Sequence, residues 1–572
     1  MMRRSHLFGV KGSSGSHAGP VILALGLSFA AALAAQRAPK FYPDDPLQRE
    51  PDTQDASKVQ EWEIGLTPDL VLNLFTKPGD LATNVRAQNI NTIDEVPDSN
   101  WFTNRILART VSVDEITRGP NTIEGPAPGK WTLLRPKSAG VSPGFTVRDE
   151  KGVVWFVTFD PDGYPVAPTA VIMVATKLFW ALGYYQVESY LTSIRPENVE
   201  IAETATIRAH GKRRPFTRAD LDEVFDRAHR SPDGSYRAVA GRGLPGRPVG
   251  GFKYYGTRPD DPNDVVPHEH RRELRALQVF GAWTNLVDMK AGNTLDTVVE
   301  DNGRSVVRHY LQDVGSTFGT GALAPRDGDE GHEYLYEGGP TAKRLFTLGL
   351  YIRPWQTMDY EEHPEIGKFE GDEFDPEQWR PRVPIAALRH VRPDDMFWAA
   401  RRVMAFTDEQ IRAAVSTGGY TDPAAEKLLA DVLIKRRDKI GRVYYSKINP
   451  LVSFALDESG VLTFENVSVG AGFGDAPKQG YQAVWSRFDN ATHEATPIGS
   501  PTTSAGERLQ APSDLPRNDG VFVKVSVQAV EPPHPAWAQP VDVYFTRTGG
   551  AWKLVGLERL ADGAAAPAAP SK

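Results

Sequence analysis

The sequence predicts an α+β protein with a β-rich region, a helical region and a small all-β domain, in that order. Between residues 126 and 450, short strand-like runs come first and amphipathic helices follow. Residues 451–560 change to alternation of apolar and polar side chains with a period of two. The 572 residues suffice for about three domains at roughly 100–200 residues each.

The composition excludes several classes of protein. The chain is 40% hydrophobic and 24% charged, as in globular proteins, which excludes a collagen, a coiled coil and a wholly disordered chain. Its 65 Lys and Arg against 73 Asp and Glu give a net charge of −8, which disfavours a nucleic-acid partner. With no cysteine, disulfides, Cys-ligated zinc, iron–sulfur clusters and a Cys nucleophile are excluded.

Residues 1–34 have the order of a secretory signal peptide. Basic residues precede an apolar run over 21–31 that ends in Ala32-Leu33-Ala34. The alternative is a membrane anchor, but the run is shorter than the roughly 20 apolar residues that a span needs. We therefore expect an exported bacterial protein, periplasmic or extracellular, with no membrane span after cleavage.

Local signals predict the first two regions that follow. Residues 35–125 are rich in Pro, Asp and Asn and predict an irregular extension, with a helix near Thr67–Phe75 and an aromatic anchor at Trp101 and Phe102. Residues 126–200 predict a β-rich lobe with one buried helix, Ala170–Gly183. Its expected strands are Trp131–Pro136, Phe145–Arg148, Val153–Phe159 and Gln186–Ser193.

Residues 201–450 predict a mainly helical lobe. His268–Val287 carries apolar residues along one face and predicts a long helix. Helix starts are predicted at Thr217, at Thr407 with Gln410 as a capping box, and at Asp422 before Pro423. Arg271, Arg272 and Glu273 are expected on a solvated face, with pairing to Asp260–Asp264 as the alternative. His268 and His270 are expected to cap a helix or to pack at the surface rather than bind metal.

Residues 451–560 predict the all-β, sandwich-like domain, and residues 561–572 predict a disordered Ala/Pro tail. Gly549-Gly550 predicts a hairpin turn. Aromatic residues of this domain would suit sugar stacking, but their period of two favours core positions. They are Trp485, Phe488, Trp537, Tyr544 and Trp552.

The motif that points most specifically to a chemical function is Asp288-x-Lys290-x-x-Asn293, followed by Asp313-Val314-Gly315. The first part follows a predicted helix and the second follows a predicted strand. Phosphoryl transfer needs such a set: Asp288 would orient or deprotonate a hydroxyl, and Lys290 would offset charge on the phosphoryl group. Asn293 and Asp313 offer the hard oxygen ligands that Mg²⁺ prefers.

On these two motifs, and on their order after a β-rich lobe, residues 126–445 resemble the protein-kinase-like superfamily. The segments Tyr255–Asp264 and His268–Leu274 also look like a family of uncharacterised exported bacterial proteins. That family is itself distantly similar to atypical kinases of the HipA and phosphoinositide-kinase type. The resemblance implies a kinase-like domain with a small β-rich lobe and a helical lobe, and implies Mg²⁺ and ATP as ligands.

The sequence departs from the kinase pattern in the β-rich lobe. Thr158 stands where the resemblance implies a strand lysine, and Ile172 or a neighbour stands where it implies a helix glutamate. Lys137 would substitute for that lysine from the turn that ends at Gly144 and contains Gly140, which is expected to cover the phosphates. An ordinary Gly/Pro hairpin is the alternative for this turn.

Three functions therefore stay open. The chain would be an exported kinase-like enzyme, a pseudokinase-like binding module, or a cell-envelope scaffold whose all-β domain holds the ligand site. ATP is scarce outside the cytoplasm, so another phosphate donor also stays open. The acceptor or envelope partner and the oligomeric state are not predicted by any motif, and Asp288 and Asn293 acting only as helix caps is the non-functional alternative.

Overall fold

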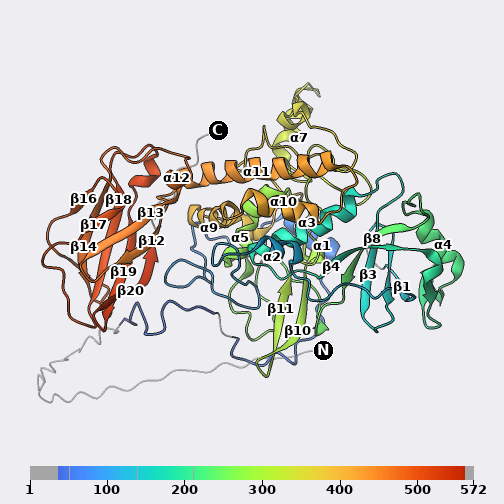
Figure 1. The fold of residues 1–572 in the computed structure, drawn as a ribbon, viewed down its shortest axis with the longest axis horizontal. Helices are drawn as coiled ribbons and strands as arrows, with labels where there is room; N and C mark the ends of the chain where they lie inside the picture. Colours follow the sequence, from blue (N-terminus) through green and yellow to red (C-terminus); the bar gives the residue numbers. More distant parts are fainter. Residues whose placement is uncertain (1–36, 50–51, 138–139, 210, 349, 561–572) are drawn as a thin grey trace, which may run out of the picture.

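The computed structural model describes residues 37–49, 52–137, 140–209, 211–348 and 350–560. The predicted signal peptide and the predicted tail at 561–572 lie outside the described residues. The mixed α+β class is confirmed, because several sheets and many helices alternate along the chain. Figure 1 shows strands β1, β3 and β8 at one end of the molecule, strands β12–β20 at the other, and most of the helices between them.

The first sheet has six strands in the order β4-β8-β3-β2-β1-β5. It is antiparallel except for the parallel pair of β1 and β5. Strand β8 lies between β3 and β4, although it comes from the segment predicted as mainly helical. The strands are β1 (Trp131–Pro136), β2 (Gly144–Arg148), β3 (Val154–Phe159), β4 (Ser189–Ile194), β5 (Val199–Ile201) and β8 (Tyr236–Arg242).

Helix α3 (Ala167–Leu182) follows β3 and is the predicted buried helix. It is apolar nearly all round, so it packs with neighbours on several sides. It ends at Gly183, whose φ of 123° is accessible mainly to glycine. A Cβ there would also lie 2.2 Å from the Phe102 ring, so the end of the helix rests on the aromatic anchor predicted in the N-terminal extension.

The helical part packs around α6 (Leu277–Thr284), α9 (Pro393–Met404), α10 (Asp408–Ser416) and α11 (Pro423–Ser446). The predicted caps are confirmed: Thr407 and Gln410 form a capping box, and Asp422 caps α11. The prediction of a single helix over His268–Val287 is wrong. A 3₁₀ turn over His268–His270, α5 (Arg272–Arg275) and α6 replace it, with Arg271 in an extended conformation between the first two.

The break in that helix turns charged side chains inward. The two arginines and Glu273 expected on a solvated face are fully buried. Arg272 alone contacts three carboxylates, at 2.9 Å from Asp94 and Asp395 and 3.1 Å from Asp394. We call the buried charged set the ionic core: Asp94, Arg258, Asp264, His268, Glu269, His270, Arg271, Arg272, Glu273, Arg275, Asp296, His309, Asp394 and Asp395.

The alternative of pairing with the acidic stretch is borne out for Arg271. Its Nη2 lies 3.4 Å from Asp264 Oδ1, and His268 Nε2 lies 2.7 Å from Asp264 Oδ2. His268 therefore packs in the interior with a carboxylate as its partner, and the expected position at the surface is wrong. Trp101 joins this set, because its ring stacks on His309 at 3.5 Å and lies under the Arg271 guanidinium at 4.4 Å.

The C-terminal β region consists of two sheets that share one apolar core. Four of the five aromatic residues predicted as core are buried, and Trp552 is half-buried. Gly549 and Gly550 both have positive φ in the turn between β19 and β20, as predicted. The strands are β12 (Leu451–Leu456), β13 (Val461–Asn466), β14 (Tyr481–Phe488), β15 (Ala495–Pro497), β16 (Thr502–Ser504), β17 (Arg508–Gln510), β18 (Phe522–Ala529), β19 (Val541–Thr548) and β20 (Ala551–Glu558).

Shorter elements complete the chain. β9 (Arg247–Pro248), β10 (Leu295–Asp301) and β11 (Arg304–Tyr310) form a three-stranded sheet beside the helices, and β6 (Thr206–Ala209) pairs with β7 (Lys212–Pro215). The remaining α-helices are α1 (Leu66–Phe75), α2 (Val113–Arg118), α4 (Arg218–Asp226), α7 (Gly338–Phe346), α8 (Ala386–Arg389) and α12 (Val467–Gly470). Among the described residues, none of the helices combines the length and apolar character that a membrane crossing requires.

The N-terminal extension runs along the helical part and joins it to the C-terminal β region (Figure 1). Phe41 packs against Phe488 and Tyr544 of that region. Farther along, Asn89 donates to Glu273 of the ionic core at 2.5 Å. The predicted helix near Thr67–Phe75 is present as α1. The extension therefore wraps the other parts instead of standing apart from them.

Candidate functional site

The loop that carries Asp288, Lys290 and Asn293 starts where α6 ends. Asn285 adopts the left-handed conformation at the helix end, with φ of 54°. Lys290 Nζ lies 2.8 Å from Asp288 Oδ2. The Asn293 side-chain amide donates to the Asp288 backbone carbonyl at 2.7 Å. These two contacts fold the loop back on itself, so that all three predicted side chains belong to one small structure.

The second loop, with Asp313, follows β11 and is joined directly to the first. The Asp313 backbone N–H donates to the Asn293 carbonyl at 3.0 Å, and the Gly315 N–H donates to Asp313 Oδ1 at 2.9 Å. The structure therefore joins the loop of Asp288 and Asn293 to Asp313, which follows Asn293 by 20 residues, across the hairpin of β10 and β11.

The chain turns after Asp313, where the Gly315 N–H donates back to Asp313 Oδ1, but this turn does not require a positive φ at the glycine. Gly315 is not among the described residues with positive φ. A Cβ at this position would instead lie 3.2 Å from both Asp313 Oδ1 and Ile172 Cγ1. The glycine is needed for space between the loop and α3. Ile172 thus faces the Asp313 loop from the helix where the kinase pattern implies a glutamate.

Lys137 directly follows β1, and its ammonium is close enough to interact electrostatically with Asp313. Its Nζ donates to Thr158 Oγ1 at 3.4 Å, so a lysine from the first strand reaches the position where the kinase pattern implies a lysine on the third. Gly140 has φ of 80°, and a Cβ on Gly144 would lie 2.2 Å from the Val157 carbonyl oxygen. Both glycines of the turn are therefore required by local geometry, which by itself also fits an ordinary hairpin.

The charge of Lys137 is coupled to Asp313. Lys137 is exposed as a residue, yet desolvation of its ammonium lowers its pKa from the ordinary value. The Asp313 carboxylate opposes this effect, and the Arg227 guanidinium adds to it. Arg227, which also donates to the Val141 carbonyl at 2.7 Å, was missed at the level of sequence because no local motif distinguishes it.

Asp288 has a buried neighbour that the sequence did not indicate. Tyr254 is 5% exposed, and burial together with the negative charge of Asp288 raises the pKa of its hydroxyl. Tyr254 therefore stays protonated and neutral beside this loop. It also lines a cavity of about 200 Å³ between α1 and the loop, with Met289, Lys290 and Asn73.

That cavity is mostly apolar with a polar end. Asp69 accepts a hydrogen bond from Tyr255 at 3.0 Å, and burial raises the pKa of the Asp69 carboxyl. Asn73 is buried, and its Oδ1 has no hydrogen-bond partner among the described residues. A group that enters here would meet apolar walls and the Asn73 carbonyl, with Lys290 at the rim.

The residues of the two loops fit a bound Mg²⁺. Asp313 is exposed, and because Asn293 uses its amide nitrogen on Asp288, its side-chain oxygen is the atom that remains for a ligand. One carboxylate and one amide oxygen suit Mg²⁺, which keeps several waters and takes other oxygens from substrate phosphates. Within the described residues, no group of three or more His, Asp or Glu side chains is arranged to hold a metal.

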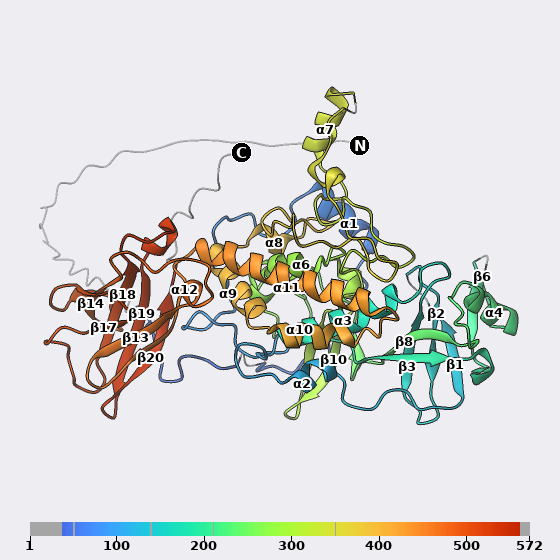
Figure 2. The same ribbon diagram turned by 45° about the horizontal axis from the view of Figure 1, so that its top comes forward.

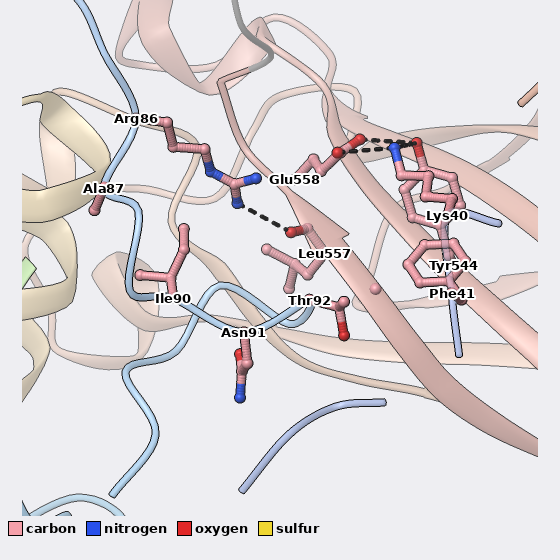
Figure 3. Close-up of a pocket in the computed structure, with 11 residues that line it drawn as sticks. Lys40, Phe41, Arg86, Ala87, Ile90, Asn91, Thr92, Tyr544, Leu557 and Glu558 are labelled. Atoms are coloured by element: carbon pink, nitrogen blue, oxygen red, sulfur yellow. Dashed lines mark hydrogen bonds and ion pairs between the residues drawn. The ribbon is translucent and has the colours of Figure 1, made fainter. Parts of the chain in front are cut away.

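A second cavity, of about 280 Å³, lies between the N-terminal extension and the C-terminal β region (Figure 3). The charged side chains that line it already have ion-pair or hydrogen-bond partners within the protein. Lys40 Nζ lies 2.9 Å from Glu558, Tyr544 donates to the same carboxylate at 2.8 Å, and Arg86 pairs with Asp94 at 2.9 Å. The cavity marks the joint between two parts of the chain, and we assign no ligand to it.

No protein-family model and no curated protein matches the chain. Among solved structures, two of the Golgi casein kinase are similar: one, with Mn/ADP bound, at 11% identity and the other at 10%. Each aligns over 70% of this chain and 94% of the kinase, with a TM-score of 0.30. At this TM-score neither similarity assigns a fold or an activity to the chain.

Proposed function

We propose that this chain is an exported kinase-like protein that binds a Mg²⁺–nucleotide between Lys137 and the two loops, and that it transfers a phosphoryl group to a hydroxyl acceptor. The single observation that carries the proposal is the bond from Asp313 N–H to the Asn293 carbonyl, which unites the two motifs. The β1–β8 sheet with α3 would be the small lobe and the helices the large lobe. The C-terminal β region would be a sandwich-like domain.

Each binding residue has a defined part in this proposal. Asn293 and Asp313 would hold Mg²⁺, which when bound neutralises charge on the phosphate oxygens. Lys137 would contact the phosphates from the opposite side, because its ammonium already faces the field of Asp313. The Gly140–Gly144 part of the turn would approach the phosphates closely, since neither glycine has a side chain.

Asp288 would act on the acceptor. Lys290 holds Asp288 Oδ2 at 2.8 Å, so Oδ1 is the oxygen that we assign to the acceptor hydroxyl. The acceptor oxygen forms a bond to the γ-phosphorus as the bond from that phosphorus to the β-phosphate oxygen breaks. The hydroxyl proton passes to Asp288, and ADP leaves. The cavity beside Lys290 and α1 would take an apolar part of the acceptor.

The test is a thermal-unfolding titration of residues 35–572 with ATP, with and without Mg²⁺. A ligand at about 100 times its Kd stabilises the native state by about 2.7 kcal/mol. We expect this stabilisation to require Mg²⁺ and to be lost in Asp313→Ala. The control is Asp475→Ala, an exposed carboxylate of the C-terminal β region. No stabilisation of the parent protein, or equal stabilisation of Asp313→Ala, would contradict the proposal.

A second candidate function is nucleotide binding without transfer. One observation favours it: Ile172 faces the Asp313 loop where the kinase pattern implies a glutamate. Asp288→Asn separates the two functions. If the chain is an enzyme, this variant binds Mg²⁺–ATP like the parent but loses transfer of radiolabelled phosphate. If the parent binds and transfers nothing to protein, lipid or sugar hydroxyls, the binding module is the better description.

A further inference from the structure

The segment around α7 projects from the helical part of the molecule. Figures 1 and 2, which differ by a turn of 45°, both show α7 extending beyond its neighbours. We call residues 338–348 and 350–352 the finger. Its large apolar side chains point away from any core: Leu345 is 74% exposed, Phe346 84%, Leu348 91%, Leu350 84% and Ile352 66%.

Among the described residues, these five are the most closely spaced group of exposed large hydrophobic side chains. Single exposed apolar residues are common on protein surfaces, whereas a contiguous exposed group marks an interaction site. The five side chains lie within eight positions of sequence, and we call them the apolar tip. They belong to a projection and not to a groove. This shape suits insertion into a lipid interface better than burial against a flat protein surface.

The charge of the finger indicates the kind of surface to which it binds. The finger contains Lys343 and Arg344 and no acidic residue, in a chain whose net charge is −8. Lys343 and Arg344 are exposed next to the apolar tip. A basic, apolar and amphipathic segment of this kind lies in the interface of a bilayer and is attracted by anionic headgroups.

The base of the finger is built to hold it outward. Trp355 Nε1 donates to Glu333 at 2.9 Å, and Arg353 pairs with the same carboxylate. The Tyr336 ring contacts Phe75 of α1 at 5.4 Å. Tyr336 and Trp355 therefore belong to the base of the finger, and Tyr351 lies between Leu350 and Ile352. Amphipathic aromatic rings are enriched at this level in proteins that meet a membrane surface.

We propose that the finger docks this protein on an anionic lipid bilayer, with the apolar tip in the interface and Lys343 and Arg344 among the headgroups. The finger would not span the bilayer. Because Phe75 of α1 contacts its base and α1 packs on the Asp288 loop, docking would hold that loop on the membrane-facing part of the molecule. The proposal does not depend on phosphoryl transfer.

The test is co-sedimentation of residues 35–572 with vesicles of phosphatidylglycerol mixed with phosphatidylcholine, and with vesicles of phosphatidylcholine alone. We expect binding to the anionic vesicles only. The double variant Phe346→Ser with Leu348→Ser should weaken it by about tenfold or more, and Lys343→Glu with Arg344→Glu should weaken it and remove its salt dependence. The matched control is Leu81→Ser with Val265→Ser, two exposed apolar residues outside the finger.

Two results would overturn the proposal. One is the absence of vesicle binding, or binding that the finger variants leave unchanged. The other is concentration-dependent self-association in analytical ultracentrifugation that the finger variants abolish while vesicle binding is lacking; the finger would then be a contact between copies. All these substitutions are at exposed positions, and far-ultraviolet circular dichroism of each variant confirms that the fold is kept.

Discussion

The ionic core and the two candidate loops contain the same kinds of charged side chain in opposite environments. In the ionic core, the side chains of Arg272 and Asp395 are 0% exposed, and Arg272 has three carboxylate partners. In the loops, the Lys290 side chain is 43% exposed and pairs with one carboxylate, Asp288. In the core, charged side chains pair with each other, whereas in the loops carboxylate oxygens such as those of Asp313 are exposed to solvent.

This difference separates structural charge from functional charge. A charge removed from water must be fully paired, or it costs several kcal/mol. The ionic core is therefore complete without a ligand, and substitutions there should act on stability. The Asp313 loop is joined to the first loop by a backbone contact, from Asp313 N–H to the Asn293 carbonyl. Substitution of the exposed Asp313 side chain should therefore act on binding and leave stability nearly unchanged.

The largest effect is expected for Arg272→Met. It removes the guanidinium and leaves Asp94, Asp394 and Asp395 buried around an apolar side chain, which should lower the free energy of unfolding by about 3–5 kcal/mol. Urea denaturation measures the change. The matched control is Arg412→Met, whose exposed pair with Asp431 should cost less than about 1 kcal/mol. Equal effects in the two variants would show that burial does not distinguish them.

The next largest effect is a loss of folding stability in acid that depends on Asp264. Burial would raise the pKa of this carboxyl, but the hydrogen bond and charge of His268 and the charge of Arg271 together hold it well below its usual range. A lowered folded-state pKa gives stability that is present above the unfolded pKa, near 4, and is lost as the pH falls through the folded value.

Stability of the parent should therefore decline from about pH 5 downward. Asp264→Asn should cost about 2 kcal/mol at pH 7 and show a flatter acid limb, because the amide does not titrate. Urea unfolding from pH 7 to pH 3 measures both values. Asp372→Asn, at an exposed pair with Lys435, serves as the control. If the free energy of unfolding of Asp264→Asn falls with acid as steeply as that of the parent, the pH dependence belongs to other carboxyls of the core.

Sequence reasoning found the loops but missed the core, for a physical reason. Caps such as Asp422 before Pro423, and the spacing from Asp288 to Asn293, are local and can be read from neighbouring residues. The partners of Arg272 lie 122 and more residues away. Without them, a run of charged residues indicates a solvated helix face. The insertion of β8 between β3 and β4 was missed for the same reason, because strand order depends on distant pairing.

The smallest effect, and the one that sharpens the comparison most, is expected for Lys137→Met. The Lys137 ammonium makes a single long hydrogen bond to Thr158 within the described residues, and desolvation already lowers its pKa, so removal of the charge should leave the free energy of unfolding within about 0.5 kcal/mol. Under the proposed function it should weaken Mg²⁺–ATP binding by about tenfold, equivalent to about 1.4 kcal/mol.

Isothermal titration calorimetry of parent and variant measures the loss. Lys130→Met is the matched control, because Lys130 is an exposed lysine at the start of the same strand and pairs with Glu200. If Lys137→Met binds the nucleotide like the parent, the lysine does not replace the missing strand lysine. The Gly140–Gly144 turn is then an ordinary hairpin, and the functional charge of the site is confined to the two loops.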